Sequence, residues 1–124
     1  MTLILAENAP RFDIPDVQFT GFASPSRGAS ENSVWRVRIA AGSAGVPHRL
    51  TREEILVAIS GNARATLGGK TFDFPAGATL IVPPETDFAL ANPGSEPFEA
   101  IAVLPVGGAA RIGGDAPFTP PWAL

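Results

Sequence analysis

The stretch that decides the fold is Gly42-Ser-Ala-Gly-Val-Pro-His48-Arg-Leu50-Thr-Arg-Glu-Glu54-Ile-Leu-Val-Ala-Ile-Ser-Gly61. His48 is the only histidine of the chain, and Glu54 follows it six residues later, at the start of an apolar run. Imidazole and carboxylate groups serve proteins both as metal ligands and as acid–base groups. The stretch therefore predicts a polar pair at the entrance of a strand, with glycine turns on both sides.

The composition limits the classes of protein to consider. A chain of 124 residues forms a single domain, and 45% hydrophobic with 17% charged residues is typical of a globular protein. The net charge of −3 argues against a protein held electrostatically to nucleic acid or to an anionic membrane. The chain has no cysteine, which excludes disulfides, thiolate metal sites and a cysteine nucleophile.

Targeting signals are missing from the sequence. No segment approaches the ~20 apolar residues of a membrane span. The N-terminal residues Met1–Glu7 lack the basic and long apolar regions of a signal peptide. We therefore expect a cytoplasmic protein with neither a membrane nor a nucleic acid as partner.

Strands and turns account for the whole chain. Thirteen glycines and thirteen prolines leave little room for helices, and no window has a sustained helical apolar period. The segments rich in β-branched and aromatic residues predict strands at Arg11–Ile14, Val17–Ala23, Val34–Ala40, Glu54–Ser60, Ala63–Leu67, Thr71–Phe74, Thr79–Val82, Asp87–Ala91 and Phe98–Leu104. Gly68-Gly69 predicts a two-residue hairpin turn. The pattern is that of an all-β sandwich or barrel.

The glycine and proline spacing resembles the two motifs of the cupin superfamily. The first motif is a glycine, five residues, His-x-His, three or four residues, a glutamate, six residues and a glycine. The matching residues here are Gly42, His48, Glu54 and Gly61, with Leu50 at the position of the second histidine.

The second cupin motif is matched at its structural positions. It reads glycine, five residues, Pro-x-Gly, two residues, a histidine, three residues and an asparagine. Gly77, Pro83 and Asn92 fit, whereas Glu85 replaces the middle glycine and Phe88 replaces the histidine. The glycines are expected at positive φ, and Asn92 is expected to bond the backbone two residues further on.

This resemblance implies a double-stranded β-helix, also called a jelly-roll or cupin barrel, and a homodimer. The barrel is expected at 34–104, with N-terminal strands and a loop at 1–33 packing on it. The Gly/Pro-rich remainder, 105–124, is expected to be an extended tail, with Phe118 and Trp122 as anchors on the barrel or on a partner subunit.

The resemblance also implies where a metal would bind, and the sequence lacks half of the donors. The cupin arrangement implies that His48 and Glu54 converge in the barrel mouth. Leu50 and Phe88, at the positions of the other two metal ligands, carry no donor atom. Catalytic metal sites typically use three protein ligands. We therefore expect no metal cofactor. The only substitutes are Gln18, Asn62, Asp73 and Asp87, and Asp87 is expected on the opposite strand face from Phe88.

The residues that replace the donors make the expected pocket apolar. The expected lining residues are Leu50, Phe88, Leu56 and Leu90. Such surroundings raise the pKa of a carboxyl and lower the pKa of an imidazole, and a mutual hydrogen bond would oppose both shifts. His48 is the nearest partner for Glu54 by spacing. The alternative is a structural role, with His48 buried and hydrogen-bonded and Glu54 paired to an arginine.

The segment Trp35-Arg-Val-Arg-Ile39 alternates between apolar and basic residues. Arg36 and Arg38 therefore share one strand face, expected toward solvent or a dimer partner. The alternative is that this pair lines the barrel and holds the carboxylate of a ligand.

Three functions remain open at this point. The first is a small-molecule-binding barrel that uses His48 and Glu54 for metal-independent acid–base chemistry of the isomerase, cyclase or lyase kind. The second is a module that binds or senses a ligand without turnover. The third is a metal-dependent, dioxygenase-like cupin with an incomplete set of ligands. The sequence names no ligand. It also lacks the tyrosine acid used by metal-free epimerases of the superfamily.

Overall fold

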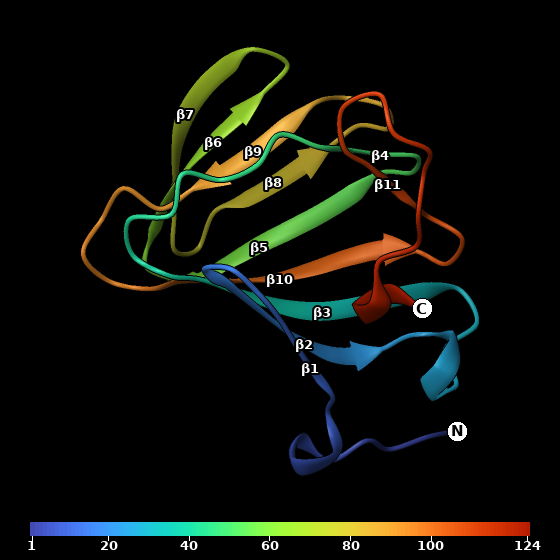
Figure 1. Ribbon diagram of the computed structural model, residues 1–124. Helices are drawn as coiled ribbons and strands as arrows, with labels where there is room; N and C mark the ends of the chain where they lie inside the picture. The colour runs from blue at the N-terminus through green and yellow to red at the C-terminus, as the bar shows by residue number, and fades with distance from the viewer.

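The computed structural model describes residues 1–124, and it consists of eleven β-strands with three single-turn 3₁₀ helices (Figure 1). The strands are β1 (Arg11–Ile14), β2 (Val17–Ala23), β3 (Asn32–Ile39), β4 (Arg49–Leu50), β5 (Glu54–Ser60), β6 (Asn62–Leu67), β7 (Lys70–Pro75), β8 (Thr79–Val82), β9 (Phe88–Ala91), β10 (Phe98–Pro105) and β11 (Ala110–Arg111). The 3₁₀ helices are η1 (Ala6–Asn8), η2 (Pro25–Arg27) and η3 (Pro121–Ala123). No helix is long and apolar enough to cross a membrane.

The strands form two facing sheets and a short two-stranded ribbon. The large sheet has the order β1-β2-β3-β10-β5-β8, and the small sheet has the order β7-β6-β9. All pairings are antiparallel. Neighbours such as β3 and β10 are far apart in sequence, as a jelly-roll requires. The prediction of an all-β jelly-roll barrel is confirmed.

Alternation along the strands places the core between the sheets. In β3 the side chains of Trp35, Val37 and Ile39 are buried, whereas Arg36 and Arg38 project from the other face. One aromatic contact between the two sheets is the pair of Phe74 from β7 and Phe98 from β10, whose ring centroids lie 5.5 Å apart.

Glycine permits the backbone at the sharp reversals. Gly68 and Gly69 have φ of +57° and +82° between β6 and β7, which is the type I′ hairpin that the sequence predicts. Gly61 combines φ of +80° with a close approach, because a Cβ atom there would lie 2.4 Å from the carbonyl oxygen of Pro97. The expected positive φ at Gly42 and Gly77 is also confirmed.

The predicted strands agree with the structure at most boundaries. The predictions at β1, β2, β5 and β8 coincide with the observed strands, and the others differ at their ends by one or two residues. The two-residue strands β4 and β11 were not predicted, because two residues show no alternation. Strand β3 begins at Asn32, within the N-terminal segment, and Ser24 and Ser33 are both buried.

The C-terminal segment folds back over the large sheet. β11 pairs with β4, and the indole of Trp122 in η3 stacks on Phe19 of β2 with centroids 3.6 Å apart and planes inclined by 4°. The buried Ser33 hydroxyl donates to the Ala123 carbonyl at 2.8 Å. The tail is thus anchored on its own barrel by Trp122, whereas Phe118 is 44% exposed.

Candidate functional site in the barrel

His48 is positioned by backbone pairing across the barrel mouth. Its N–H donates to the Phe88 carbonyl at 2.9 Å, and the Phe88 N–H donates back to the His48 carbonyl at 2.8 Å. The imidazole ring lies against the Phe88 ring, with centroids 4.2 Å apart. The residue that replaces the family's metal-binding histidine therefore packs against the histidine that remains.

The protonation of His48 follows from its surroundings. Nδ1 lies 3.0 Å from the Val46 carbonyl oxygen. A carbonyl oxygen only accepts, so Nδ1 carries the proton and the lone pair is on Nε2. Burial lowers the pKa of His48, and the bond to Val46 and the charge of Asp87 oppose this only in part. His48 is therefore a neutral base at neutral pH.

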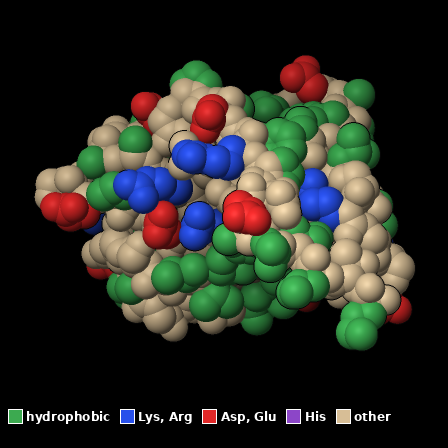
Figure 2. Space-filling view, turned by 90° about the horizontal axis from the view of Figure 1, so that it is seen from below, with side chains coloured by type: hydrophobic (Ala, Val, Ile, Leu, Met, Phe, Trp, Pro, Cys, Tyr) green, Lys and Arg blue, Asp and Glu red, His purple; other side chains and the backbone are tan.

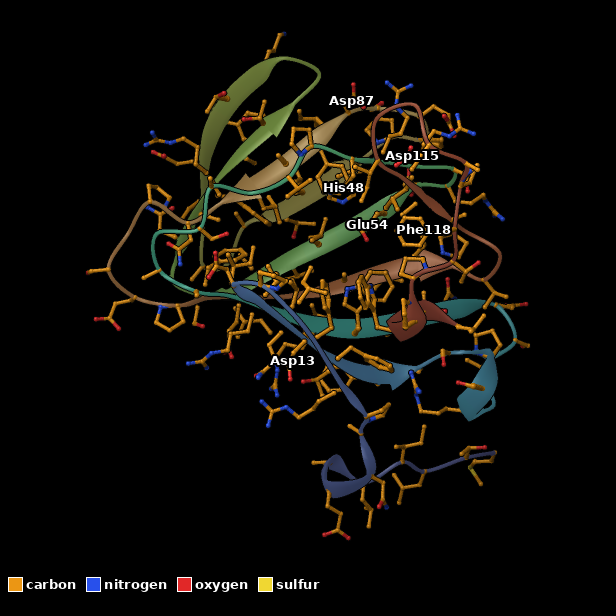
Figure 3. The ribbon with its side chains drawn as sticks, viewed as in Figure 1. Asp13, His48, Glu54, Asp87, Asp115 and Phe118 are labelled. Atoms are coloured by element: carbon orange, nitrogen blue, oxygen red, sulfur yellow. The ribbon has the colours of Figure 1, made fainter.

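Glu54 is the first residue of β5 and faces the interior opposite Val82 of β8 (Figure 3). It is only 5% exposed, and no hydrogen bond or ion pair to its carboxyl group is present. Burial raises the pKa of Glu54 to about 8. At neutral pH the group is a protonated acid that can donate one hydrogen bond.

The expected pairing of His48 with Glu54 is not formed. No hydrogen bond or ion pair joins the two side chains; His48 bonds the Val46 carbonyl through Nδ1, and its Nε2 has no protein partner. The alternative partner for Glu54, a neighbouring arginine, is also absent, since the four ion pairs of the structure involve other acids. The Nε2 atom of His48 and the carboxyl of Glu54 are therefore both available to a ligand.

The surroundings of this pair are apolar. Leu50, Leu56 and Phe88 are buried in the core, and Leu90 packs against it with partial exposure. Such walls explain both pKa shifts, because neither a cation nor a dipole compensates the charged form of the carboxyl.

The residues of the barrel do not fit a metal ion. No three of the His, Asp and Glu side chains come together in a way that would hold one. Among the substitute donors, Asp87 is exposed and bound in two hydrogen bonds by Arg49, at 2.8 and 3.0 Å. Asp73 is exposed and lies 3.6 Å from Arg64. One imidazole nitrogen and one buried carboxyl remain, which is fewer than stable sites use.

The second motif keeps its structural residues. Asn92 is 1% exposed, and its amide donates to the carbonyls of Ile39 and Glu96 at 3.1 and 2.8 Å while its oxygen accepts from the Gly94 N–H at 3.1 Å. The predicted bond two residues ahead is confirmed. Glu85, at the position of the family's glycine, retains a left-handed φ of +57°. The glycine of the motif is thus explained by backbone geometry.

Arg36 and Arg38 lie outside the barrel. Both project from the face of β3 opposite to Trp35 and Val37, and Arg38 is paired with Glu99 of β10 at 3.1 Å. The strand register fixes this placement, so the alternative in which the two arginines meet a ligand inside the barrel does not apply.

One contributor to the site was missed by the sequence analysis. Gly45 has φ of +78°, and a Cβ atom there would lie 2.5 Å from the Leu90 carbonyl oxygen. This close approach places the Val46 carbonyl next to His48. The sequence signal for this feature was Gly45 itself. It lies two residues before Pro47, in a segment where no strand or hairpin was predicted that would need a glycine.

Solved structures with this fold include proteins of several activities. The match to the polyketide cyclase RemF from Streptomyces resistomycificus has a TM-score of 0.75 and 12% identity, covering 85% of this chain and 79% of the cyclase. A variant of oxalate decarboxylase OxdC from Bacillus subtilis matches with a TM-score of 0.76 and 19% identity, over 86% of this chain and 30% of the decarboxylase. A salicylate 1,2-dioxygenase from Pseudoaminobacter salicylatoxidans matches with a TM-score of 0.71 and 15% identity, over 88% and 32%.

These identities are low, and the similarity therefore shows the fold alone. The chain spans about a third of the decarboxylase and of the dioxygenase. A comparison with curated proteins finds no match. The family model of the cupin domain matches residues 35–104, which is more than half of the chain and includes His48, Glu54 and Phe88. The chain belongs to the cupin domain family.

Proposed function

We propose that the barrel binds an uncharged, largely apolar small molecule at His48 and Glu54 without a metal ion. The observation that carries this proposal is the buried Glu54 carboxyl, which has no protein partner. Glu54 keeps slight contact with solvent, because the fully buried side-chain atoms that lack a partner belong to Arg27 and Arg111. A carboxyl held in an apolar interior without a protein partner is a candidate contact for a ligand.

The protonation states indicate what the ligand offers. The protonated Glu54 is a donor, and Nε2 of the neutral His48 is an acceptor. A ligand with a carbonyl group next to an acidic C–H bond meets both needs. Its oxygen would accept the Glu54 proton while His48 removes the proton from carbon, giving an enol, a glutamate anion and an imidazolium ion. Isomerase, cyclase and lyase reactions begin with this step, and binding without turnover uses the same contacts.

The ligand class can be tested with acetophenone and 2-naphthol as probes and benzoate as a charged control. We expect the two neutral probes to shift the NMR methyl signals of Leu50, Leu56 and Leu90 in a saturable way, and benzoate to have little effect because the walls are apolar. Glu54→Leu should weaken probe binding by about tenfold, the value of one hydrogen bond to the site. Glu53→Leu, at the exposed neighbouring position, is the matched control.

Two results would count against the proposal. The first is that neither neutral probe moves the leucine methyl signals. The second is that Glu54→Leu and Glu53→Leu bind the probes equally well, which would remove Glu54 from the site.

Metal independence has its own test. We expect elemental analysis of the purified protein to find no stoichiometric iron, manganese, nickel or zinc, because the barrel supplies too few donors. Near-stoichiometric metal in the wild-type protein that is lost in Glu54→Leu would favour the metal-dependent alternative. The double variant Leu50→His/Phe88→His serves as a positive control, since it adds the two donors that the motifs lack.

We also propose that the protein is a homodimer that uses the outer face of β5 and β8. Support comes from Val57, Ile59 and Ile81, which are 40%, 49% and 56% exposed on adjacent strands. An uncharged β-branched surface of this kind suits a second copy of itself. Light scattering should give twice the 12.8 kDa chain mass, and Ile81→Glu should give the monomer. A wild-type monomer would contradict this part of the proposal.

A further inference from the structure

The outer face of the large sheet carries a hollow that lies outside the barrel interior and is lined by charged residues. Figure 2 shows basic and acidic side chains gathered in one zone of the molecule, beside a broad area of hydrophobic side chains. The hollow measures about 290 Å³. Its lining consists of residues from the η1 segment, β1, β2, β3 and β10, namely Ala6, Ala9, Arg11, Gln18, Thr20, Arg36, Arg38 and Glu99.

The strand register brings two arginines to either side of a hydroxyl group. Arg11 of β1 is directly opposite Thr20 of β2, and Thr20 is directly opposite Arg36 of β3. Directly opposite residues of antiparallel strands project from the same face, with Cβ atoms about 5 Å apart. The three side chains therefore form one row across the sheet. Thr20 lies in the middle, with Arg11 on the neighbouring strand to one side and Arg36 on the neighbouring strand to the other.

These two arginines have no acidic partner in the structure. In the adjacent row Arg38 is neutralised by Glu99 at 3.1 Å, whereas neither Arg11 nor Arg36 forms an ion pair. The guanidinium group of Arg36 is held over the Phe22 ring, with its central carbon 5.7 Å from the ring centroid. The only acid that lines the hollow is thus already paired, and the hollow has an excess of positive charge in a chain of net charge −3.

We propose that this hollow binds a small organic molecule through a doubly charged oxyanion, with Arg11 and Arg36 on its two sides and the Thr20 hydroxyl between them. A guanidinium group presents parallel N–H donors that match the oxygens of a phosphate or a pair of carboxylates. Gln18 supplies a further neutral donor at the edge of the hollow. The volume limits the ligand to a small molecule. Because Glu99 neutralises only Arg38, the positive charges of Arg11 and Arg36 remain available to bind the anion.

Nearby acids limit the choice of anion. Asp13 is directly opposite Gln18 and lines the neighbouring hollow with Asp16 and Arg38. These carboxylates disfavour a ligand whose negative charge extends along β1 beyond Arg11. The geometry therefore points to a compact dianion, such as a phosphate monoester or a short dicarboxylate, and not to a polyanion such as a nucleic acid.

The test uses inorganic phosphate and succinate as probes, added at constant ionic strength against sodium chloride. We expect saturable shifts of the backbone amide NMR signals of Thr20 and Arg36 with at least one of the two probes. The stronger probe identifies the source of the dianion. Arg36→Gln should weaken binding at least tenfold, and Arg52→Gln, which removes an exposed arginine outside the hollow, should leave binding unchanged.

A second variant protects the test against a folding defect. Thr20→Val keeps the β-branched shape of a strand residue and should weaken binding a few-fold with the same thermal midpoint as the wild type. The proposal is overturned if neither probe gives shifts beyond those of chloride, or if Arg36→Gln binds as tightly as Arg52→Gln. Glu54→Leu should bind both probes normally, so a failure here and a failure of the barrel site are distinguishable.

Discussion

Two buried polar side chains from the family motifs, Glu54 in the barrel mouth and Asn92 in the turn between β9 and β10, have opposite environments. Asn92 makes three hydrogen bonds to the backbone and is 1% exposed. Glu54 is 5% exposed and makes none. A satisfied buried amide stabilises one backbone geometry, whereas a buried carboxyl without a protein partner contributes no such bond and loses most of its hydration.

The difference distinguishes a residue whose bonds stabilise the fold from one whose carboxyl is available to a ligand, as the proposed function requires. Stability alone would favour an apolar residue at position 54, like Leu50 and Phe88 in the same core. Proteins retain destabilising groups where activity or binding needs them. We therefore propose that this carboxyl marks the place where a ligand would bind.

The largest expected effect is on the pH dependence of stability. The folded pKa of Glu54, about 8, lies above its ordinary value of 4.5. The neutral form favours the folded state, so this stability is fully present below pH ~4.5 and is lost as pH rises through the folded pKa. The loss amounts to about 1.4 kcal/mol per pH unit and up to about 5 kcal/mol in total. Glu54→Gln should abolish the loss and be the more stable protein at pH 9, as measured by urea unfolding.

The comparison of the wild type with Glu54→Gln isolates the effect of Glu54 on stability from that of His48. The lowered pKa of His48 acts in the opposite direction, since its stability contribution is lost as pH falls below the ordinary histidine value. His48 is present in both proteins, and its effect cancels in the difference. If the difference in free energy of unfolding between the wild type and Glu54→Gln does not change between pH 4.5 and 8, the carboxyl is solvated in the folded protein.

Removing the Asn92 side chain should have the second-largest effect. Asn92→Ala leaves the carbonyls of Ile39 and Glu96 without their donor and should lower the free energy of unfolding by about 3 kcal/mol. Asn62→Ala, at an exposed position, is the control and should cost under about 0.5 kcal/mol. If Asn92→Ala and Asn62→Ala lower the free energy of unfolding equally, the hydrogen bonds of Asn92 do not stabilise the fold, and the contrast between Asn92 and Glu54 is wrong.

The tail that folds over the barrel gives a third, smaller test. Trp122→Ala removes the ring stacked on Phe19 and should cost about 2 kcal/mol in chemical unfolding, less than for a fully buried tryptophan because Trp122 is partly exposed. Phe118→Ala should cost clearly less, since Phe118 is 44% exposed. If Phe118→Ala is the more damaging variant, the anchor of the tail has been misassigned.

The smallest expected effect concerns backbone strain in the second motif. Glu85→Gly should stabilise the protein by about 0.5–1 kcal/mol, because glycine adopts the left-handed φ of +57° without strain. Glu85→Ala keeps the strain and should bring no gain. The Arg111 ion pair lost in both variants is long, 3.9 Å, and surface-exposed, so it contributes little. The thermal midpoints of the two variants measure this difference.

Local rules predicted most of the fold. The alternation in Trp35–Ile39, the hairpin at Gly68-Gly69 and the positive φ at Gly61 each follow from a residue and its near neighbours. The ribbon of β4 and β11 depends on a contact between distant segments, which leaves no local pattern. The burial of Ser33 likewise depends on the C-terminal Ala123 carbonyl.

The residues of the candidate site could be named from the sequence, but their bonding could not. Motif spacing identifies His48 and Glu54 and the apolar walls around them. The direction of the His48 ring is set by the Val46 carbonyl, which belongs to the backbone and is invisible in side-chain spacing. The sequence therefore did not show that the two side chains would remain unbonded to each other. The side of the sheet that carries Arg36 follows from alternation only once the buried face is known.

The pKa of Glu54 tests the central claim most directly. It can be read from the pH titration of the ¹³C-labelled side-chain carboxyl signal, assigned by its loss in Glu54→Gln. An apolar barrel with an unpartnered, protonated carboxyl predicts a midpoint near pH 8. A midpoint near the ordinary value of 4.5 would mean that water or a cation reaches the group, and it would contradict the neutral acid on which the proposed site depends.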